Sequence, residues 1–273
     1  MTRQDGRLRL CGVFAHPDDE TLGTGGTLAR CAAEGVDTYV VTATRGQRGR
    51  YKDGSNHPGP EALGRIREAE LRAACQVLSV KEVSLLDYWD KDLDQADPDE
   101  VIGSIVAHLR RIRPQVVLTF DPAGGYGHPD HIAICQFATA AVVAAGDASY
   151  HPPGEPAPPH RVSKLYYIAW TRAKWQAYQA ALKKLVSRVD DIERQAAPWE
   201  DWAITTVIDT EQHWATVWKA VRCHESQVSI YRPLAELPDE LHKGLWGTQE
   251  YYRVMSLVNG GRERETDLFA GLR

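Results

Sequence analysis

The chain has 273 residues, of which 43% are hydrophobic and 25% are charged, the balance of a globular protein rather than a disordered or fibrous one. Asp and Glu number 37 against 32 Lys and Arg, so the formal net charge is −5 and duplex nucleic acid is not an expected ligand. No apolar run reaches the roughly 18 residues that predict a transmembrane helix, and no signal peptide is expected.

The first 145 residues alternate between apolar, strand-like runs and amphipathic, helix-like ones. Strands are predicted at 8–15, 36–44, 83–86 and 115–120. Helices are predicted at 25–34, 61–78, 97–112 and 132–145. This order predicts an α/β fold, a Rossmann-like three-layer sandwich with a mainly parallel sheet and helices on both faces.

The pattern becomes less regular from about residue 146, where seven of the eight tryptophans lie. The segment 151–160 holds five prolines and is predicted to be a loop or a lid. Further strands are predicted at 164–170, 203–208 and 251–257, and a helix at 210–223. No linker or internal repeat is visible, so we predict one domain, 1–273, with a decorated C-terminal portion.

Five cysteines are spread along the chain without any Cys-x-x-Cys pair. This odd and scattered set predicts neither a disulfide framework nor a zinc knuckle. Reduced thiols in a cytoplasmic protein are the simplest interpretation.

The run Ala15-His16-Pro17-Asp18-Asp19-Glu20 directly follows the first predicted strand. Ligands of parallel sheets bind beyond the carboxyl ends of the strands, where this run is expected. One imidazole and three carboxylates within five positions repel one another unless a cation is present, which a divalent metal would supply. The alternative is an acidic turn that caps the following helix.

A second run, Tyr126-Gly127-His128-Pro129-Asp130-His131, follows the strand 115–120 and opens the next helix. It therefore lies at the same edge of the predicted sheet. Two histidines and an aspartate at one strand-to-helix connection, facing a second such connection, are hard to explain by a purely structural role. Three protein ligands with water in the fourth position would make a catalytic metal site.

These two runs make the chain similar to the LmbE/PIG-L superfamily of zinc-dependent de-N-acetylases. The resemblance covers about residues 8–228. Its weaker matches are 44–46 with Gly49, 67–71, 86–90 and 224–227. It implies a Rossmann-like sheet and a zinc-dependent hydrolase that removes acetyl from an N-acetylglucosamine-type amino sugar or its conjugate.

The resemblance also implies roles for individual residues. The catalytic base of the family falls on Asp18. Its zinc ligands fall on His16, Asp19 and His131. The ligand types favour Zn²⁺, although Fe²⁺, Co²⁺ or Ni²⁺ could occupy the same site.

Three neighbouring residues are expected to assist the reaction. A protonated His128 would stabilise the oxyanion or protonate the leaving amine, and Asp130 would hold that imidazole. Tyr126 matches a tyrosine that can lend its hydroxyl to the oxyanion.

The substrate is expected to meet residues at the same edge. Arg67 and Asp90 match positions that bind sugar hydroxyls or a neighbouring group of the substrate. Arg45 belongs to a basic loop that could meet an anionic part of the substrate, or could simply be solvated. The loops 45–60 and 146–161 are expected to shape the pocket.

Two other functions stay open at this point. An amidase of the same fold could cut a non-acetyl amide of a thiol conjugate or natural product. A non-catalytic metal-binding protein is a further alternative, although a binder has no need of a base and an acid beside the metal. We expect a small-molecule substrate, and a homo-oligomer is left open.

Overall fold

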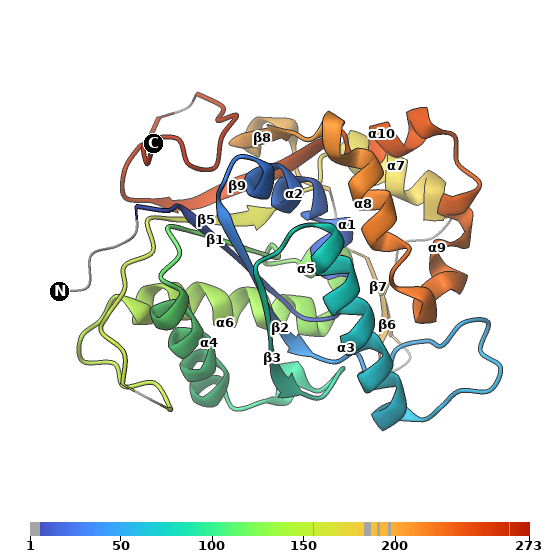
Figure 1. Ribbon diagram of the computed structural model, residues 1–273, viewed down its shortest axis with the longest axis horizontal. Helices are drawn as coiled ribbons and strands as arrows, with labels where there is room; N and C mark the ends of the chain where they lie inside the picture. The colour runs from blue at the N-terminus through green and yellow to red at the C-terminus, as the bar shows by residue number, and fades with distance from the viewer. Residues whose placement is uncertain (1–5, 155, 183–186, 190–191, 196–197, 262) are drawn as a thin grey trace.

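The structure, a computed structural model, describes residues 6–154, 156–182, 187–189, 192–195, 198–261 and 263–273 (Figure 1). Seven strands form one sheet in the order β3-β2-β1-β4-β5-β9-β8. Neighbours from β3 to β5 run parallel, and β9 is antiparallel to both β5 and β8. The predicted α/β class with a mainly parallel sheet is confirmed.

The bounds of the elements agree with the predictions in the first half of the chain. The strands of the sheet are β1 (Arg9–Phe14), β2 (Asp37–Thr44), β3 (Glu82–Tyr88), β4 (Val116–Thr119), β5 (Lys164–Ile168), β8 (Thr206–Asp209) and β9 (Thr248–Ser256). A separate pair is β6 (Ser187–Val189) and β7 (Ile192–Arg194). The helices are α1 (Asp19–Leu22), α2 (Gly25–Ala33), α3 (Pro60–Val77), α4 (Pro98–Ile112), the short turn α5 (Gly124–Gly127), α6 (Pro129–Ala145), α7 (Arg172–Leu182), α8 (Trp214–Val221), α9 (Val228–Ala235) and α10 (Asp239–Trp246).

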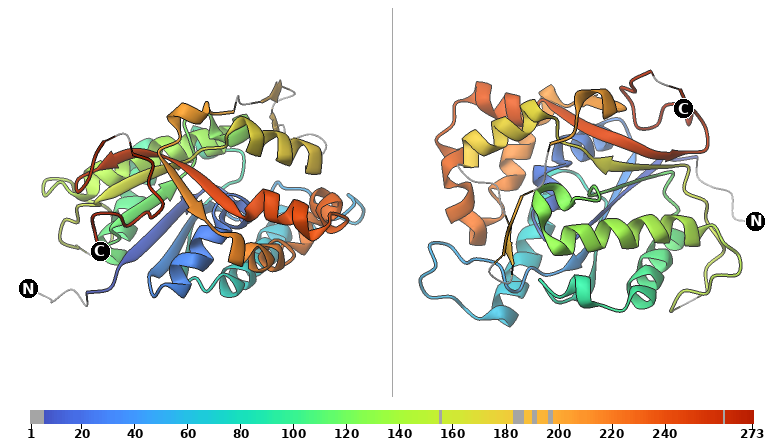
Figure 2. Two further views of the ribbon diagram at one scale, coloured as in Figure 1. Left: turned by 90° about the horizontal axis from the view of Figure 1, so that it is seen from above. Right: turned by 180° about the vertical axis from the view of Figure 1, so that it is seen from behind.

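The helices lie on both faces of the sheet (Figure 2). Helices α4 and α6 pack against each other on one face, and α2 and α3 pack against α8 on the other. Strands β1, β2 and β4 are buried almost throughout, as expected for central strands covered on both sides. The start of α4 is fixed as predicted, because the Asp97 carboxylate accepts the Asp99 N–H at 2.8 Å and Pro98 occupies the first turn.

The C-terminal portion adds a second, smaller core beside the sheet. Helices α7 to α10 gather at one end of the molecule (Figure 1), where Tyr178, Val217, Leu234 and Trp246 are buried together. Helices α7, α9 and α10 were not predicted from the sequence. Helix α9 contains Pro233, which obscures its helical pattern.

The prediction that the proline-rich segment 151–160 shapes the pocket is wrong. Pro153 lies against Gly103 of α4. The His160 imidazole is buried and its Nε2 lies 2.7 Å from the Pro114 carbonyl, just before β4 begins. The segment therefore covers the amino ends of the strands, at the edge opposite the two motifs. Among the described residues, no helix is long and apolar enough to cross a membrane.

Candidate active site

The two motifs meet at the point where the strand order reverses. From β1 the chain adds β2 and β3 on one side, and β4 and β5 follow on the other. The loops after β1 and β4 therefore diverge and leave a crevice at the carboxyl ends of these strands, the usual ligand site of such sheets. His16 follows β1 and His131 lies in the first turn of α6, and their rings approach to 3.1 Å between Nδ1 and Nε2.

The turn after β1 has a strained backbone that internal bonds hold in place. Asp18 has a φ of 104°, a region that residues other than glycine rarely adopt. The Glu20 carboxylate accepts the Asp18 N–H at 2.9 Å, and its other oxygen lies 2.9 Å from His224 Nε2. The Thr21 hydroxyl donates to the Asp18 carbonyl. Strain of this kind is common where a side chain must be aimed at a ligand.

The third predicted metal ligand joins the two histidines. Asp19 Oδ2 accepts the backbone N–H groups of Ala15 and His16 at 3.2 and 2.8 Å. Its Oδ1 points to His131 and lies 3.4 Å from Nε2, while Oδ2 lies 3.7 Å from His16 Nδ1. Burial, opposed by His16, raises the pKa of Asp19 to about 7. The three predicted ligands thus converge from the turn after β1, the start of α1 and the first turn of α6.

The hydrogen bonds of the two rings test whether this cluster suits a cation. His16 turns Nε2 to two carboxylates, Asp90 at 3.1 Å and Asp130 at 3.0 Å. His131 turns Nδ1 to the Gly124 carbonyl at 3.2 Å, which can only accept. A neutral ring in either position has its proton on the outer nitrogen, so the facing nitrogens need a cation between them. Burial opposes protonation of His16, but Asp90 and Asp130 raise its pKa well above its usual value. A proton on His16 Nδ1 or a metal ion can therefore supply this cation. Facing lone pairs beside a carboxylate are a favourable arrangement only around a positive ion.

The spacing also suits a tetrahedral ion. Ligand atoms at the usual zinc distances lie roughly 3.3 Å from one another. The facing nitrogens of His16 and His131 are 3.1 Å apart, Asp19 Oδ1 lies 3.4 Å from His131 Nε2, and the second oxygen, Oδ2, lies 3.7 Å from His16 Nδ1. Two overlapping donor groups share His16: one with His128 and His131, the other with Asp90 and Asp130. The second group contacts the outer nitrogen of His16, so we regard it as the support of a ligand rather than a ligand set.

Asp18 lies beside this cluster and is held through one oxygen. Its Oδ2 accepts the Tyr231 hydroxyl at 2.6 Å and Arg67 Nη2 at 3.2 Å. The carboxylate also lines a pocket that reaches Asp19 and His131. One oxygen is thus fixed by two donors, and the described residues offer no hydrogen bond to Oδ1.

His128 and Asp130 do not form the pair that the sequence predicts. The Asp130 carboxylate contacts His16 Nε2 and accepts the Lys91 N–H at 2.7 Å. It is the Asp130 backbone N–H that contacts His128, donating to Nδ1 at 3.2 Å. Asp130 belongs to the first turn of α6, and its carboxylate is buried. His128 precedes this turn as the N-cap, so the two side chains do not meet.

His128 also differs from the expected protonated form. Burial and the positive charge of a protonated His16 lower the pKa of His128 to about 4. The ring is therefore neutral near pH 7, and its proton is on Nε2 because Nδ1 accepts a hydrogen bond. It remains close to the cluster, with its ring centroid 4.9 Å from that of His131.

The predicted substrate-binding residues have partners inside the protein. Arg67 is only 4% exposed and donates to the Gly46 and Pro17 carbonyls as well as to Asp18. Arg45 pairs with Glu68 at 2.8 Å and with Asp87.

Asp90 is only 3% exposed and contacts His16. Burial alone would raise the pKa of Asp90, but His16 and Arg67 hold it well below its usual range. Arg67 therefore supports Asp18 and Asp90 supports His16, whereas the partly exposed Arg45 pairs with Glu68 and Asp87.

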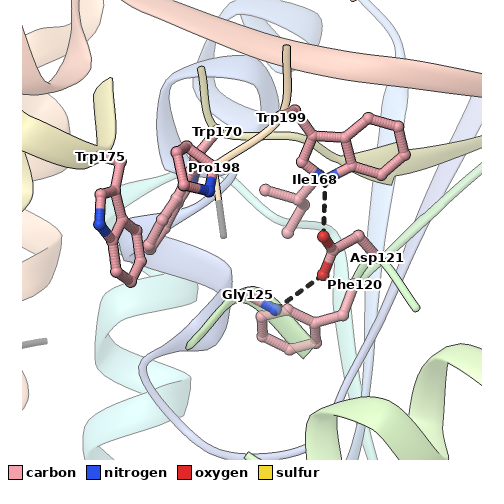
Figure 3. Close-up of a pocket in the computed structure, with 8 residues that line it drawn as sticks. All are labelled: Phe120, Asp121, Gly125, Ile168, Trp170, Trp175, Pro198 and Trp199. Atoms are coloured by element: carbon pink, nitrogen blue, oxygen red, sulfur yellow. Dashed lines mark hydrogen bonds between the residues drawn. The ribbon is translucent and has the colours of Figure 1, made fainter. Parts of the chain in front are cut away.

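Tyr126 lies on a loop of unusual backbone above the cluster. Gly124, Gly125 and Gly127 all have positive φ, which residues with a Cβ rarely adopt. Asp121 fixes this loop by accepting the Gly125 N–H at 2.7 Å and the Trp199 indole N–H at 2.6 Å (Figure 3). Burial raises the pKa of Tyr126 well above its usual value, so its hydroxyl keeps the proton that an oxyanion would accept.

The pocket beside Asp18 has a volume of about 120 Å³. Asp18, Asp19, Tyr126, His131 and Tyr231 form its polar end. The rest of its wall is apolar and aromatic, and is formed by Leu22, Gly23, Phe120, Ile168, Trp170, Tyr178 and Leu182. Much of this wall comes from β5 and α7 of the second half.

Sequence reasoning did not identify Tyr231 or the wall of this pocket. Tyr231 is 213 positions from Asp18 and lies in an unpredicted helix. The one signal available was the concentration of tryptophans in the second half, of which Trp170 lies in the wall. His224, which belongs to one of the weaker family matches, contacts Glu20, and Glu20 in turn accepts the Asp18 N–H.

The fold and this cluster together define the class of the protein, an α/β hydrolytic enzyme whose site is suited to a metal ion. A family profile described as PIG-L, GlcNAc-PI de-N-acetylase, matches residues 11–142. The chain belongs to this family, which confirms the resemblance inferred from its motifs and its class as a hydrolase that acts on amides.

Similar proteins cover nearly the whole chain. A 1D-myo-inositol 2-acetamido-2-deoxy-α-D-glucopyranoside deacetylase of Streptomyces avermitilis is 37% identical, with 97% of each chain covered. A mycothiol S-conjugate amidase of Streptomyces coelicolor is 32% identical, with 98% of each chain covered. Among solved structures, a conserved protein of Thermus thermophilus matches with a TM-score of 0.63 and 25% identity over 94% of this chain and 99% of that one.

Proposed function

We propose that the chain is a zinc-dependent deacetylase that hydrolyses an N-acetylglucosamine-type amide to the free amine and acetate. The observation that carries this proposal is the position of Asp18, a carboxylate held through one oxygen by Tyr231 and Arg67, beside Asp19 and the facing nitrogens of His16 and His131. The proposed metal ligands are His16, Asp19 and His131. Zinc at this site would lower the pKa of a bound water towards about 7 and polarise the substrate carbonyl.

The residues of the chain would then divide the proton transfers between them. Asp18 Oδ1 accepts a proton from the attacking water, since Tyr231 and Arg67 hold Oδ2. The neutral His128 donates its Nε2–H, and Tyr126 its hydroxyl, to the developing oxyanion. Asp18 then returns its proton to the leaving nitrogen as the C–N bond breaks, so that amide plus water gives amine plus acetate.

The sugar would lie over the ends of β2 and β3, where the rim carries polar and aromatic groups. Arg48 pairs with Asp92, and its guanidinium lies over the half-exposed Trp89 at 5.8 Å from the ring centroid. An indole face beside charged groups suits a sugar ring with its hydroxyls. The Streptomyces avermitilis relative is named for a glucosamine-inositol substrate, which supports this substrate class.

The second candidate is an amidase that cuts a non-acetyl amide of a thiol conjugate or natural product. The relative named mycothiol S-conjugate amidase supports it. A set of substrates that shares the sugar and differs in the acyl group distinguishes the two candidates.

The test is release of acetate by purified, zinc-loaded protein from N-acetylglucosamine, diacetylchitobiose and N-acetylglucosaminyl-inositol. Asp18→Ala should retain about one zinc per chain and lose activity by about 10²–10⁴-fold, the usual contribution of a general base. Asp239→Ala, at an exposed position of α10, is the matched control and should retain both. Loss of zinc from Asp18→Ala, or undiminished turnover in it, would contradict the assignment of the base.

A further inference from the structure

The pocket beside Asp18 has two chemically different ends. Its polar end consists of the residues assigned to the reaction, and its far end is formed by Leu22, Ile168, Trp170, Tyr178 and Leu182. We propose that this far end binds the acyl chain of the substrate, and that the enzyme accepts linear acyl groups longer than acetyl. The proposal rests on the proposed function and extends it to the acyl side of the scissile amide.

The volume of the pocket exceeds the need of an acetyl methyl group. It measures about 120 Å³, whereas an apolar cavity of about 150 Å³ can hold a benzene molecule. A methyl group would leave much of the apolar wall without contacts, and such contacts are individually small but collectively large. A chain of about four to six carbons fills a space of this size.

The chemistry of the far end favours a hydrocarbon over the sugar or its aglycone. The Tyr178 hydroxyl donates to the Leu22 carbonyl at 2.7 Å and accepts the Trp246 indole N–H at 3.1 Å. The Tyr231 hydroxyl is used by Asp18. A polyol placed here would lose its water without gaining the hydrogen bonds of these hydroxyls, which is costly. The polar rim of Arg48, Asp92 and Trp89 is the better place for it.

The wall of the pocket is formed before any substrate binds. The Trp170 ring stacks on Tyr178 with centroids 4.7 Å apart and planes at 15°, and Tyr178 is anchored at its hydroxyl. A neighbouring cavity shares Phe120, Ile168 and Trp170 (Figure 3). That cavity measures only about 10 Å³, room for at most a single water, so the acyl pocket ends at this wall.

The experiment compares kcat/KM for glucosamine N-acylated with acetyl, propanoyl, butanoyl and hexanoyl groups. Burial of each added methylene should raise kcat/KM by up to about fourfold until the pocket is full. Leu182→Trp should lower the hexanoyl-to-acetyl ratio at least tenfold, and Leu182→Ala should move the preference to longer chains. The same two substitutions at Leu241, which is exposed on α10, are the matched controls and should leave the ratio unchanged.

Gly23→Ala provides a gentler variant at a second position. Its φ of −91° accepts alanine, and the new Cβ would lie 3.0 Å from Ile168 Cδ1, at the wall of the pocket. It should lower the same ratio by a few-fold. Metal content and melting temperature of every variant identify any that fail to fold.

The outcomes separate this inference from the proposed function. If no acyl glucosamine is hydrolysed, including the acetyl one, the proposed function itself fails. If the acetyl substrate turns over while the longer ones are at least tenfold poorer, only the acyl pocket is overturned. A second series of substrates keeps the acetyl group and varies the aglycone. The acyl pocket is also overturned if the Leu182 variants change selectivity in this series but not in the acyl series.

Discussion

Two clusters of buried polar side chains can be compared in this molecule. The catalytic cluster consists of His16, Asp19, Asp90, Asp130 and His131 at the carboxyl ends of β1 and β4. The anchoring cluster consists of Lys164, Tyr166, Thr206, Arg253, Asn259 and Glu265, where the end of the chain lies against β5, β8 and β9. Both clusters are buried away from water. They differ in how many of their polar atoms have hydrogen-bond partners within the protein.

The anchoring cluster is satisfied from within the chain. Glu265 Oε1 receives Lys164 Nζ at 2.5 Å, Asn259 Nδ2 at 2.6 Å and Arg253 Nη1 at 2.9 Å. Its Oε2 accepts the hydroxyls of Tyr166 and Thr206. Five donors converge on one carboxylate, so the cluster has no need of a further ligand.

The catalytic cluster is left incomplete. The facing nitrogens of His16 and His131 need a cation between them beside Asp19, and Asp130 Oδ1 is buried with no hydrogen-bond partner among the described residues. A fully satisfied network stabilises a fold, whereas an incomplete one at a strand switch point indicates a place for a ligand. The predictions below test this contrast.

The largest effect is expected from His16→Ala, which removes one of three proposed ligands. Zinc should be lost and kcat/KM should fall by more than about 10³-fold, because hydrolysis needs the hydroxide that the metal supplies. Metal analysis of the purified variant, together with acetate release, measures both. His151→Ala, at an exposed position of the opposite sheet edge, is the control, and full zinc occupancy in His16→Ala would exclude His16 as a ligand.

Breaking the anchoring cluster should change stability and leave the site intact. Lys164→Met removes a fully buried cation from Glu265 and should lower the free energy of unfolding by about 3 kcal/mol. Denaturant unfolding measures this, with the exposed Lys219→Met as control. The activity of the folded fraction should be unchanged, and a variant that remained as stable but lost turnover would reverse the assignment of the two clusters.

The acid sensitivity of the fold should depend on Glu265. Burial alone would raise the pKa of Glu265, but its bonds to Lys164, Asn259 and Tyr166 lower it from 4.5 to about 2. The stabilisation is therefore complete above pH 4.5 and is lost as the pH falls towards 2. The melting temperatures of the wild type and Glu265→Gln should differ by a constant amount near neutrality and converge below pH 4. A difference that grew in acid would contradict this sign.

The smallest effect is expected at the edge of the catalytic cluster. Tyr231→Phe removes the hydroxyl bonded to Asp18 Oδ2 and should lower kcat about tenfold, with zinc content and KM little changed. Tyr150→Phe, near the amino ends of the strands, is the matched control. A fall in zinc content equal to the fall in kcat would assign Tyr231 to the metal site instead of the base.

The alternation of strand-like and helix-like runs in the sequence predicted most of the fold and the position of both motifs. It placed residues 15–20 and 126–131 at one sheet edge, because parallel strands end on the same side. It could not predict in which direction the side chains of each strand-to-helix connection point. Asp130 is next but one to His128 in sequence, yet the first turn of α6 directs its carboxylate to His16.

Contacts between segments far apart in the chain could not be predicted from the sequence. Tyr231 reaches Asp18 only through the packing of α9 against α7 and the turn before it, which no local pattern encodes. The proline-rich segment looked like a lid by composition alone. Composition predicts a loop but does not say at which edge of the sheet that loop lies.

The crevice at the strand switch point also governs when the site can exist. His16 and His131 are 115 positions apart and come together only after β1 pairs with β4, where Leu10 lies opposite Val116. A growing chain therefore has no complete donor set until most of its parallel sheet is assembled. Metal capture should follow this pairing, and by mass action a free metal concentration of about 1,000 times Kd would add about 4 kcal/mol to the stability of the folded chain.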